Sequence, residues 1–194
     1  MKSLVAFDPE RSEGNKVTKA NALIEARYKL TVQEQRLILA YISLLSPEDE
    51  DFPTVEIKVK DLIQLLELED HDYYDKIKET LERLRSRVIK IRKPDGYLIT
   101  GWISSAEYFD KEGKIELTLD PKLKPYLLKL KEAFTTYALR NILKLRSSYA
   151  IRLYELLKQY QNIGRRRFTI EELRSILKIQ PDEYTRYMTT SNAS

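Results

Sequence analysis

Apolar residues recur at helical spacing in three stretches of the chain. The first follows Thr31-Val32-Gln33-Glu34, a capping-box pattern, and its apolar stripe runs from Leu37 to Leu45. The other two cover residues 72–87 and 147–160, again with apolar positions three and four residues apart. Spacing of this kind is typical of a helix that buries one face. We therefore predict a helix in each of the three stretches.

Alternating apolar and polar residues predict strands between these helices. The alternating or strand-like stretches are 55–59, 88–92, 97–109 and 114–119. Pro94-Asp95-Gly96 separates the second of these from the third and is typical of a tight turn. We therefore predict a three-stranded antiparallel meander after the helix at 72–87.

The order of these elements predicts a winged helix. A short helix at 60–68 is joined by a tight polar turn to the longer helix at 72–87, which is the helix-turn-helix pattern. A β-hairpin after such a pair gives DNA a second contact, beside the helix. The fold class predicted is therefore α+β, a winged helix.

A similar order begins again in the second half of the chain. A long helix at 147–160 precedes a predicted strand, short helix and turn at 166–181, with a second capping box at Thr169-Ile170-Glu171-Glu172. We infer tandem winged-helix units, of which the second ends before its recognition helix and wing. The alternative is one domain with a helical C-terminal subdomain.

This order sets the predicted domain boundaries. A disordered tail is expected at 1–15, the first winged-helix domain at 16–136, and the start of the second at 137–187. A flexible tail is expected at 188–194, and a single helix is predicted over 121–134.

Charge is distributed unevenly along the 194 residues. The chain carries a net charge of +4, but residues 121–194 hold 15 basic and 6 acidic residues, and residues 1–120 hold 19 basic and 24 acidic. The basic C-terminal part suggests a polyanionic partner. Solvated helix faces are the alternative explanation.

Composition excludes several classes of enzyme and site. Without cysteine there are no disulfides or thiolate zinc sites, and the single histidine, His71, cannot supply a paired-histidine metal centre. The P-loop pattern GxxxxGK[ST] does not occur. We expect no enzymatic activity, no cofactor and no bound metal. No apolar run approaches the roughly 20 residues of a membrane span, so a cytoplasmic location and no membrane partner are expected.

Three motifs carry a family resemblance. The segment Arg27-Tyr28-Lys29-Leu30-Thr31, with Gln35-Arg36-Leu37, resembles the opening motif of the Rep initiators of iteron-type, theta-replicating plasmids. The segment 148–157, SYAIRLYELL, is similar to their most recognisable helix, and 168–179 resembles the stretch that follows it. The resemblance covers about residues 16–187.

The resemblance implies two winged-helix domains related by pseudo-symmetry. It implies binding of double-stranded DNA, as monomers at repeated origin sites (iterons) and as dimers at an inverted repeat, where such proteins repress their own transcription. It also implies that the first domain serves largely for dimerisation, that the second supplies much of the base readout, and that host replication proteins are partners. Members of this family continue with a basic recognition helix, whereas here Tyr187 is followed by small polar residues.

Candidate DNA contacts fall into three basic groups. The exposed face of the helix at 72–87 carries Asp72, Asp75, Glu79 and Glu82, which repel phosphate, so contact by its flank or with a protein partner is expected there. The other groups are the hairpin turn and an arginine cluster. The predicted DNA-binding residues are Lys76, Arg83, Arg87, Lys90, Arg92, Lys93, Arg165, Arg166 and Arg167.

Each group has a structural alternative. The helix could be solvated and laced by pairs four residues apart such as Glu79–Arg83, the hairpin lysines could protect a sheet edge, and the cluster could be a solvated loop. For Arg152, an ion pair with Glu155 is the alternative to a functional role.

Two other functions compete with replication initiation. One is a winged-helix transcriptional regulator with no replication role, and the other is a module for dimerisation alone. Binding to repeated origin sites separates the first from an initiator, and weak binding without sequence preference would indicate the second.

Overall fold

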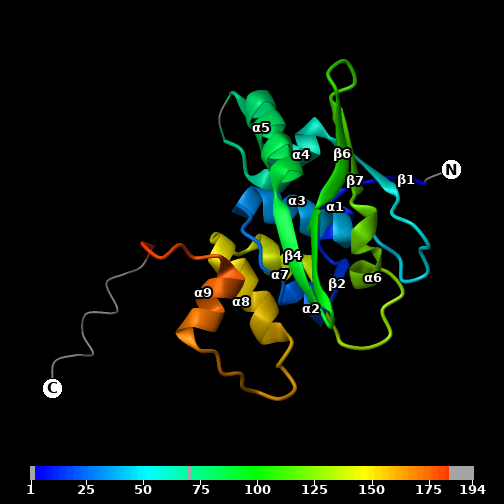
Figure 1. Ribbon diagram of the computed structural model, residues 1–194. Coiled ribbons are helices and arrows are strands. Elements are labelled where there is room, and N and C mark those ends of the chain that lie inside the picture. Colours follow the sequence, from blue (N-terminus) through cyan, green and yellow to red (C-terminus); the bar gives the residue numbers. More distant parts are fainter. Residues whose placement is uncertain (1–2, 70, 184–194) are drawn as a thin grey trace.

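The computed structural model describes residues 3–69 and 71–183. At its centre is a four-stranded sheet in the order β1–β3–β7–β6 (Figure 1). β1 (Leu4–Ala6) runs parallel to β3 (Thr54–Lys58), while β7 (Lys114–Leu119) pairs antiparallel with β3 on one side and β6 (Ile103–Phe109) on the other. Alternate residues of β3 and β7 are buried, which is why these two segments alternate in sequence.

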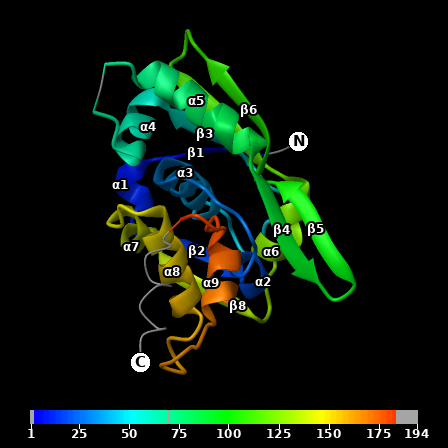
Figure 2. The same ribbon diagram turned by 60° about the vertical axis from the view of Figure 1, so that its left-hand side comes forward.

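Two further ribbons lie outside this sheet. β2 (Lys16–Ala20) pairs antiparallel with β8 (Phe134–Ala138), and β4 (Val88–Lys93) pairs antiparallel with β5 (Gly96–Gly101). The second ribbon, residues 88–101, is the wing, and Figure 2 shows it projecting from the side of the molecule.

The helices surround a core built on α3 (Val32–Ile42). α4 (Val59–Leu66) and α5 (Tyr73–Ser86) form the helix-turn-helix pair, and α5 packs beside β6. The remaining helical segments are α1 (Pro9–Ser12), α2 (Asn21–Ile24), a 3-10 turn (Pro121–Leu123), α6 (Lys124–Leu127), α7 (Leu139–Leu143), α8 (Ser148–Lys158) and α9 (Ile170–Leu177).

The predicted capping box of α3 is confirmed. The Thr31 hydroxyl accepts a hydrogen bond from the Glu34 N–H, and the Glu34 carboxylate accepts one from the Thr31 N–H. The helices predicted at 60–68, 72–87 and 147–160 are confirmed within two residues at each end. The α+β winged-helix fold is therefore present as predicted.

The three-stranded meander was a wrong prediction. β4 and β5 form their own ribbon, whereas β6 joins β7 in the central sheet. The chain changes sheets at Trp102, which lies between β5 and β6, and both Trp102 and the first residue of β6, Ile103, are buried. Two buried neighbours cannot lie on one face of a single continuous strand, because successive side chains point to opposite faces.

The prediction of a disordered tail at 1–15 was also wrong for the described residues. β1 adds to the edge of β3, the Phe7 N–H donates to the Glu56 carbonyl oxygen at 2.8 Å, and the Phe7 ring is buried. Asp8 then caps α1. Phe7 anchors this segment, although the polar residues around it are typical of a tail.

A single helix over 121–134 was predicted, and this too is corrected. The helical part ends at Leu127, Lys129 and Ala133 have positive φ of 52° and 49°, and Phe134 begins β8. β8 is required as the partner of β2, and this tertiary pairing overrides the local helical pattern.

Only part of the predicted second winged-helix unit is found among the described residues. The predicted short helix is α9, but the strand predicted before it is not present at 166–169. α9 packs with α8 and α2 in a small apolar cluster of Ile24, Leu156, Ile176 and Leu177, whereas Leu139 and Ile151 belong to the main core. The domain boundaries stay predictions, and the tail expected at 188–194 lies beyond the last described residue, Glu183.

Candidate nucleic-acid interface

The wing presents its basic residues at an exposed tip. Lys93 pairs with Gly96, so only Pro94 and Asp95 lie in the turn, and Gly96 has the positive φ that such a turn requires. Arg92 and Lys93 are exposed on either face of the ribbon next to this turn. A tip of this shape brings cations to a phosphate backbone without requiring base contacts.

The outer face of the wing also carries Tyr97. Cross-strand partners share a face, so Lys90 with Ile99, and Arg92 with Tyr97, lie on the same side of the ribbon. The Lys90 ammonium lies 4.1 Å from the centroid of the Tyr97 ring and the Arg92 guanidinium carbon 6.0 Å from it. Cation–π contact with the ring holds these two cations in place on the exposed face.

Two of the predicted DNA contacts on or next to α5, Arg83 and Arg87, are instead paired with a carboxylate of the protein itself, that of Glu34. The Arg87 Nε donates to both Glu34 carboxylate oxygens, at 3.1 and 3.0 Å, and the Arg83 Nε lies 3.5 Å from one of them. Arg83 also pairs with Glu79 at 3.0 Å, so that predicted pair is confirmed. Lys76, the third predicted contact on this helix, is half-buried.

The arginine loop, Arg165–Arg167, divides its side chains between two directions. The Arg166 side chain is 9% exposed, donates to both oxygens of the Glu25 carboxylate, and lies over the rings of Tyr160 and Phe168. Arg165 and Arg167 are exposed. The loop therefore offers two arginines to a partner, and the third anchors it.

Burial would lower the pKa of Arg166, but its hydrogen bonds and charge contact with Glu25 outweigh burial and raise the pKa. The guanidinium therefore stays charged while it is packed between two rings. Gln159 donates to the same Glu25 carboxylate at 3.0 Å, which ties the end of α8 to α2 as well.

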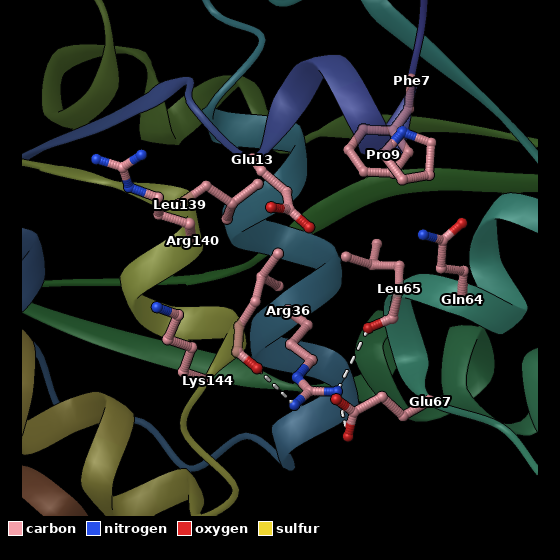
Figure 3. Close-up of a pocket in the computed structure, with 11 residues that line it drawn as sticks. Phe7, Pro9, Glu13, Arg36, Gln64, Leu65, Glu67, Leu139, Arg140 and Lys144 are labelled. Carbon is pink, nitrogen blue, oxygen red and sulfur yellow. Dashed lines mark hydrogen bonds and ion pairs between the residues drawn. The ribbon is translucent and has the colours of Figure 1, made fainter.

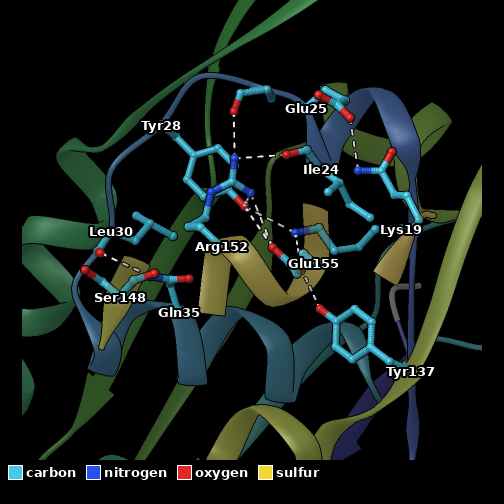
Figure 4. A network of polar contacts seen from close by, with 12 residues as sticks. Lys19, Ile24, Glu25, Tyr28, Leu30, Gln35, Tyr137, Ser148, Arg152 and Glu155 are labelled. Carbon is cyan, nitrogen blue, oxygen red and sulfur yellow. Dashed lines mark hydrogen bonds and ion pairs between the residues drawn. The ribbon is translucent and has the colours of Figure 1, made fainter. Parts of the chain in front are cut away.

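A buried polar network joins the family-like motifs in space (Figure 4). It consists of Lys19, Tyr28, Tyr137, Arg152 and Glu155. Lys19 and Glu155 are each 1% exposed, with the Lys19 Nζ 2.8 Å from the carboxylate. The predicted Arg152–Glu155 ion pair is confirmed at 3.3 Å, although both groups are buried rather than at the surface.

Arg152 also fixes the backbone before α3. Its guanidinium donates to the carbonyl oxygens of Ile24 and Ala26, both at 2.9 Å, and lies over the Tyr28 ring. Burial alone would raise the pKa of Glu155, but the charges of Lys19 and Arg152 outweigh it and lower the pKa. The network is therefore ionised and structural.

Gln35 and Arg36, from the second half of the opening motif, are structural as well. Gln35 donates to the carbonyl oxygens of Leu30 and Ser148, and Arg36 donates to that of Leu143 at 3.0 Å. Figure 3 shows Arg36 beside Glu67, 3.0 Å away, at the edge of a cavity of about 250 Å³. The motif residues thus hold α3, α4, α7 and α8 together.

Sequence reasoning missed two of the residues that shape this surface and its support. Lys19 was not identified, although it lies two residues after the buried Val17 in β2 and therefore on the same, buried face of the strand. Tyr97 was read only as part of a strand, and its position opposite Arg92 in the hairpin register is the signal that identifies its role.

The helix α5 lies apart from the turn of the wing and from the arginine loop. In Figures 1 and 2, α5 lies at the upper end, whereas the turn of the wing and the loop that precedes α9 lie in the lower half.

Within residues 3–69 and 71–183, no helix is both long and apolar enough to cross a bilayer.

Comparison with known proteins identifies the relatives. The family described as "Initiator Replication protein, WH1" matches residues 16–158. A replication initiation protein of Escherichia coli is 32% identical over 150 residues, which are 74% of this chain and 46% of that protein. An uncharacterized 27.6 kDa protein of Escherichia coli is 31% identical over 163 residues, which are 77% of this chain and 68% of that protein.

The fold has a solved counterpart as well. The Pi initiator protein, crystallised in complex with iteron DNA, superimposes with a TM-score of 0.66 at 21% identity, over 86% of this chain and 73% of that one. The chain spans about half the length of the first curated relative. The predicted resemblance to plasmid replication initiators is confirmed: the chain belongs to the Initiator Replication protein family, whose WH1 model matches residues 16–158.

Proposed function

We propose that this chain binds double-stranded DNA at the repeated sites of a plasmid origin and acts there as a replication initiator. The observation that carries the proposal is the wing, whose tip places Arg92 and Lys93 in solvent beside a helix-turn-helix. Family membership supports it, because a relative is a replication initiation protein and the Pi initiator was crystallised with iteron DNA.

The division of charge supports contact through the wing and the arginine loop rather than through α5. The outward face of α5 carries exposed Asp75, Glu79 and Glu82, and phosphate would be repelled there. Arg83 and Arg87 are engaged with Glu34, so we propose Lys90, Arg92, Lys93, Arg165 and Arg167 as the direct phosphate contacts.

Binding to labelled duplexes tests this function. One duplex carries the direct repeats of the origin, a second the operator palindrome, and a third a scrambled sequence. A preference of tenfold or more for the repeats, about 1.4 kcal/mol, is expected for an initiator, whereas preference for the palindrome alone favours a transcriptional regulator. Equal binding to all three would refute sequence recognition by this chain.

A charge-matched pair of variants tests the contacts. Replacement of Lys90, Arg92 and Lys93 by glutamine should reduce the slope of log K against log salt by up to about 3, since each phosphate contact contributes about 0.9. The control replaces Lys58, Lys60 and Lys111, three exposed lysines on other elements, with the same change in charge. Equal effects of the two triple variants would contradict contact by the wing.

We also propose that two copies associate through the root of the wing. Val88 and Ile99 are 51% and 64% exposed on one face of it, and exposed apolar residues side by side are typical of an interaction surface. Sedimentation should show dimers lost in Ile99→Lys and retained in Ile163→Lys, a control in the loop before α9. Dimerisation of both variants would contradict this surface.

Host replication proteins are proposed as further partners on the ground of family membership. We propose that the chain acts by binding rather than by catalysis, since one histidine and no cysteine leave few groups suited to acid–base or nucleophilic chemistry.

A further inference from the structure

Glu34 is a fully buried carboxylate that joins three elements. It is 0% exposed and lies in the first turn of α3, where its Oε2 accepts from the Thr31 N–H at 2.8 Å. The same carboxylate accepts from Arg87 at 3.0 Å and lies 3.5 Å from the Arg83 Nε. The charge is therefore satisfied by a helix N-terminus and by two arginines of α5.

Arg87 lies at the joint between α5 and the wing. It is the C-cap of α5, its N–H donates to the Leu84 carbonyl oxygen, and Val88 begins β4 directly after it. The Arg87 Nε–H is shared between both Glu34 oxygens, and Nε is the guanidinium nitrogen nearest the backbone, so the pair holds the arginine side chain close to this joint. The direction in which the wing leaves α5 is thus set against α3.

Apart from Arg87, the wing is tethered by a backbone bridge and by its inner face, where Ile89, Ile91 and Leu98 pack into the main core. Its ladder joins β4 to β5 only, in a sheet separate from the four-stranded one. Among the described residues, its backbone contact with the rest of the protein is the bridge between Arg27 and Lys90, at 3.0 and 3.2 Å, and its buried side chains on β4 are Ile89 and Ile91.

We propose that Glu34 is a positioning residue for DNA binding: through Arg87 and Arg83 it orients the wing so that Lys90, Arg92 and Lys93 reach the phosphates together. This inference rests on the proposed function. It assigns Arg83 and Arg87 to the support of the wing rather than to the DNA.

The direction in which Glu34→Gln changes DNA affinity distinguishes a positioning role from a purely electrostatic effect. The substitution removes one negative charge and releases two arginines, so electrostatics alone would tighten DNA binding and steepen its salt dependence. A wing that loses its orientation would instead bind more weakly. We expect about tenfold weaker binding to the repeat duplex, with a salt slope lower by about 1 to 2, because each phosphate that the wing no longer reaches lowers the slope by about 0.9.

Two variants serve as controls. Glu82→Gln makes the same change in charge at an exposed position of α5, and it should leave affinity equal or slightly higher. Arg87→Lys keeps the net charge but removes the Nε–H that both Glu34 oxygens accept, and it should reproduce most of the loss. If Arg87 instead touched phosphate itself, lysine would retain most of the binding as a point charge.

Titrations are made on the 194-residue protein, with circular dichroism and the urea midpoint showing that each variant is folded at the assay temperature. If Glu34→Gln does not fold, Arg87→Lys and the double-mutant cycle of Arg83→Gln with Arg87→Gln carry the test. Loss of affinity with a lower salt slope supports positioning, since partial unfolding would lower the active fraction and leave the slope unchanged. Affinity at or above that of the wild type, with an equal or steeper slope, overturns it.

Failure of this inference is distinguishable from failure of the proposed function. If the triple glutamine variant of the wing tip loses binding while Glu34→Gln and Arg87→Lys do not, the wing contacts DNA without help from Glu34. If the triple variant binds like the wild type, the proposed contact itself is wrong.

Discussion

Substitution of Glu155 by glutamine should destabilise this protein more than most single changes. The carboxylate accepts from Lys19 at 2.8 Å, from Arg152 at 3.3 Å and from Tyr28 at 3.4 Å, and also from Tyr137. All these groups are buried, so water cannot replace a lost partner.

The magnitude follows from the charge that is left behind. Glutamine is neutral, and its amide N–H₂ would face donors where the carboxylate offered an acceptor. The Lys19 ammonium would then be buried without a counter-charge, and removal of one partner of a buried pair costs about 3–5 kcal/mol. With a urea m-value of about 2 kcal/mol per molar, the midpoint should fall by roughly 1.5–2.5 M.

Equilibrium urea unfolding, followed by circular dichroism, measures this loss. The matched control is Glu172→Gln, an exposed carboxylate 4.0 Å from Arg166, where less than about 0.5 kcal/mol is expected. The double variant Lys19→Met with Glu155→Leu should recover only part of the loss, because it removes the buried ammonium but leaves Arg152 without its counter-charge. A loss below about 1 kcal/mol in Glu155→Gln would refute the reasoning.

Three other predictions follow from the same structure. The pKa of Glu155 is lower in the folded protein than its ordinary value of 4.5. The carboxylate therefore contributes fully to stability above pH 4.5, and this contribution is lost as the pH falls below that value. The urea midpoints of the wild type and Glu155→Gln should consequently converge in acid. Arg167→Gln should lower the salt slope of DNA binding by about 0.9 with little change in stability. Arg166→Gln should instead lower the thermal midpoint, because it releases Glu25 and loosens α9. Equal slopes for the wild type and Arg167→Gln would count against contact by this loop. Thr31→Ala removes the cap of α3 and should cost about 1 kcal/mol in urea unfolding, and a neutral result would show that Glu34 alone holds the first turn.

Local patterns in the sequence predicted most of the helices and strands, because capping boxes and apolar periodicity act within a few residues. The errors arose where distant segments decide the outcome. Phe134 lies in a strand because β2 needs a partner, and this pairing has no local signal. The stretch 97–109 is divided into β5 and β6, which belong to different sheets, although each pairs with the neighbour expected in the meander.

The candidate site was predicted in the same partial way. Basic residues at the turn and before α9 could be identified from the sequence, but which of them are free could not. Arg87 and Arg166 are occupied by Glu34 and Glu25, carboxylates 53 and 141 residues away in the chain. Such partners become visible only when the fold is known.

The N-terminal strand has a practical consequence. β1 covers one edge of the central sheet by pairing with β3, and the other edge strand is β6. A shortened protein that begins at residue 16, where the family match starts, would leave the backbone N–H and C=O groups of β3 unpaired. Bare edges of this kind recruit strands from other chains, so the shortened protein should aggregate at concentrations at which the longer one remains dispersed.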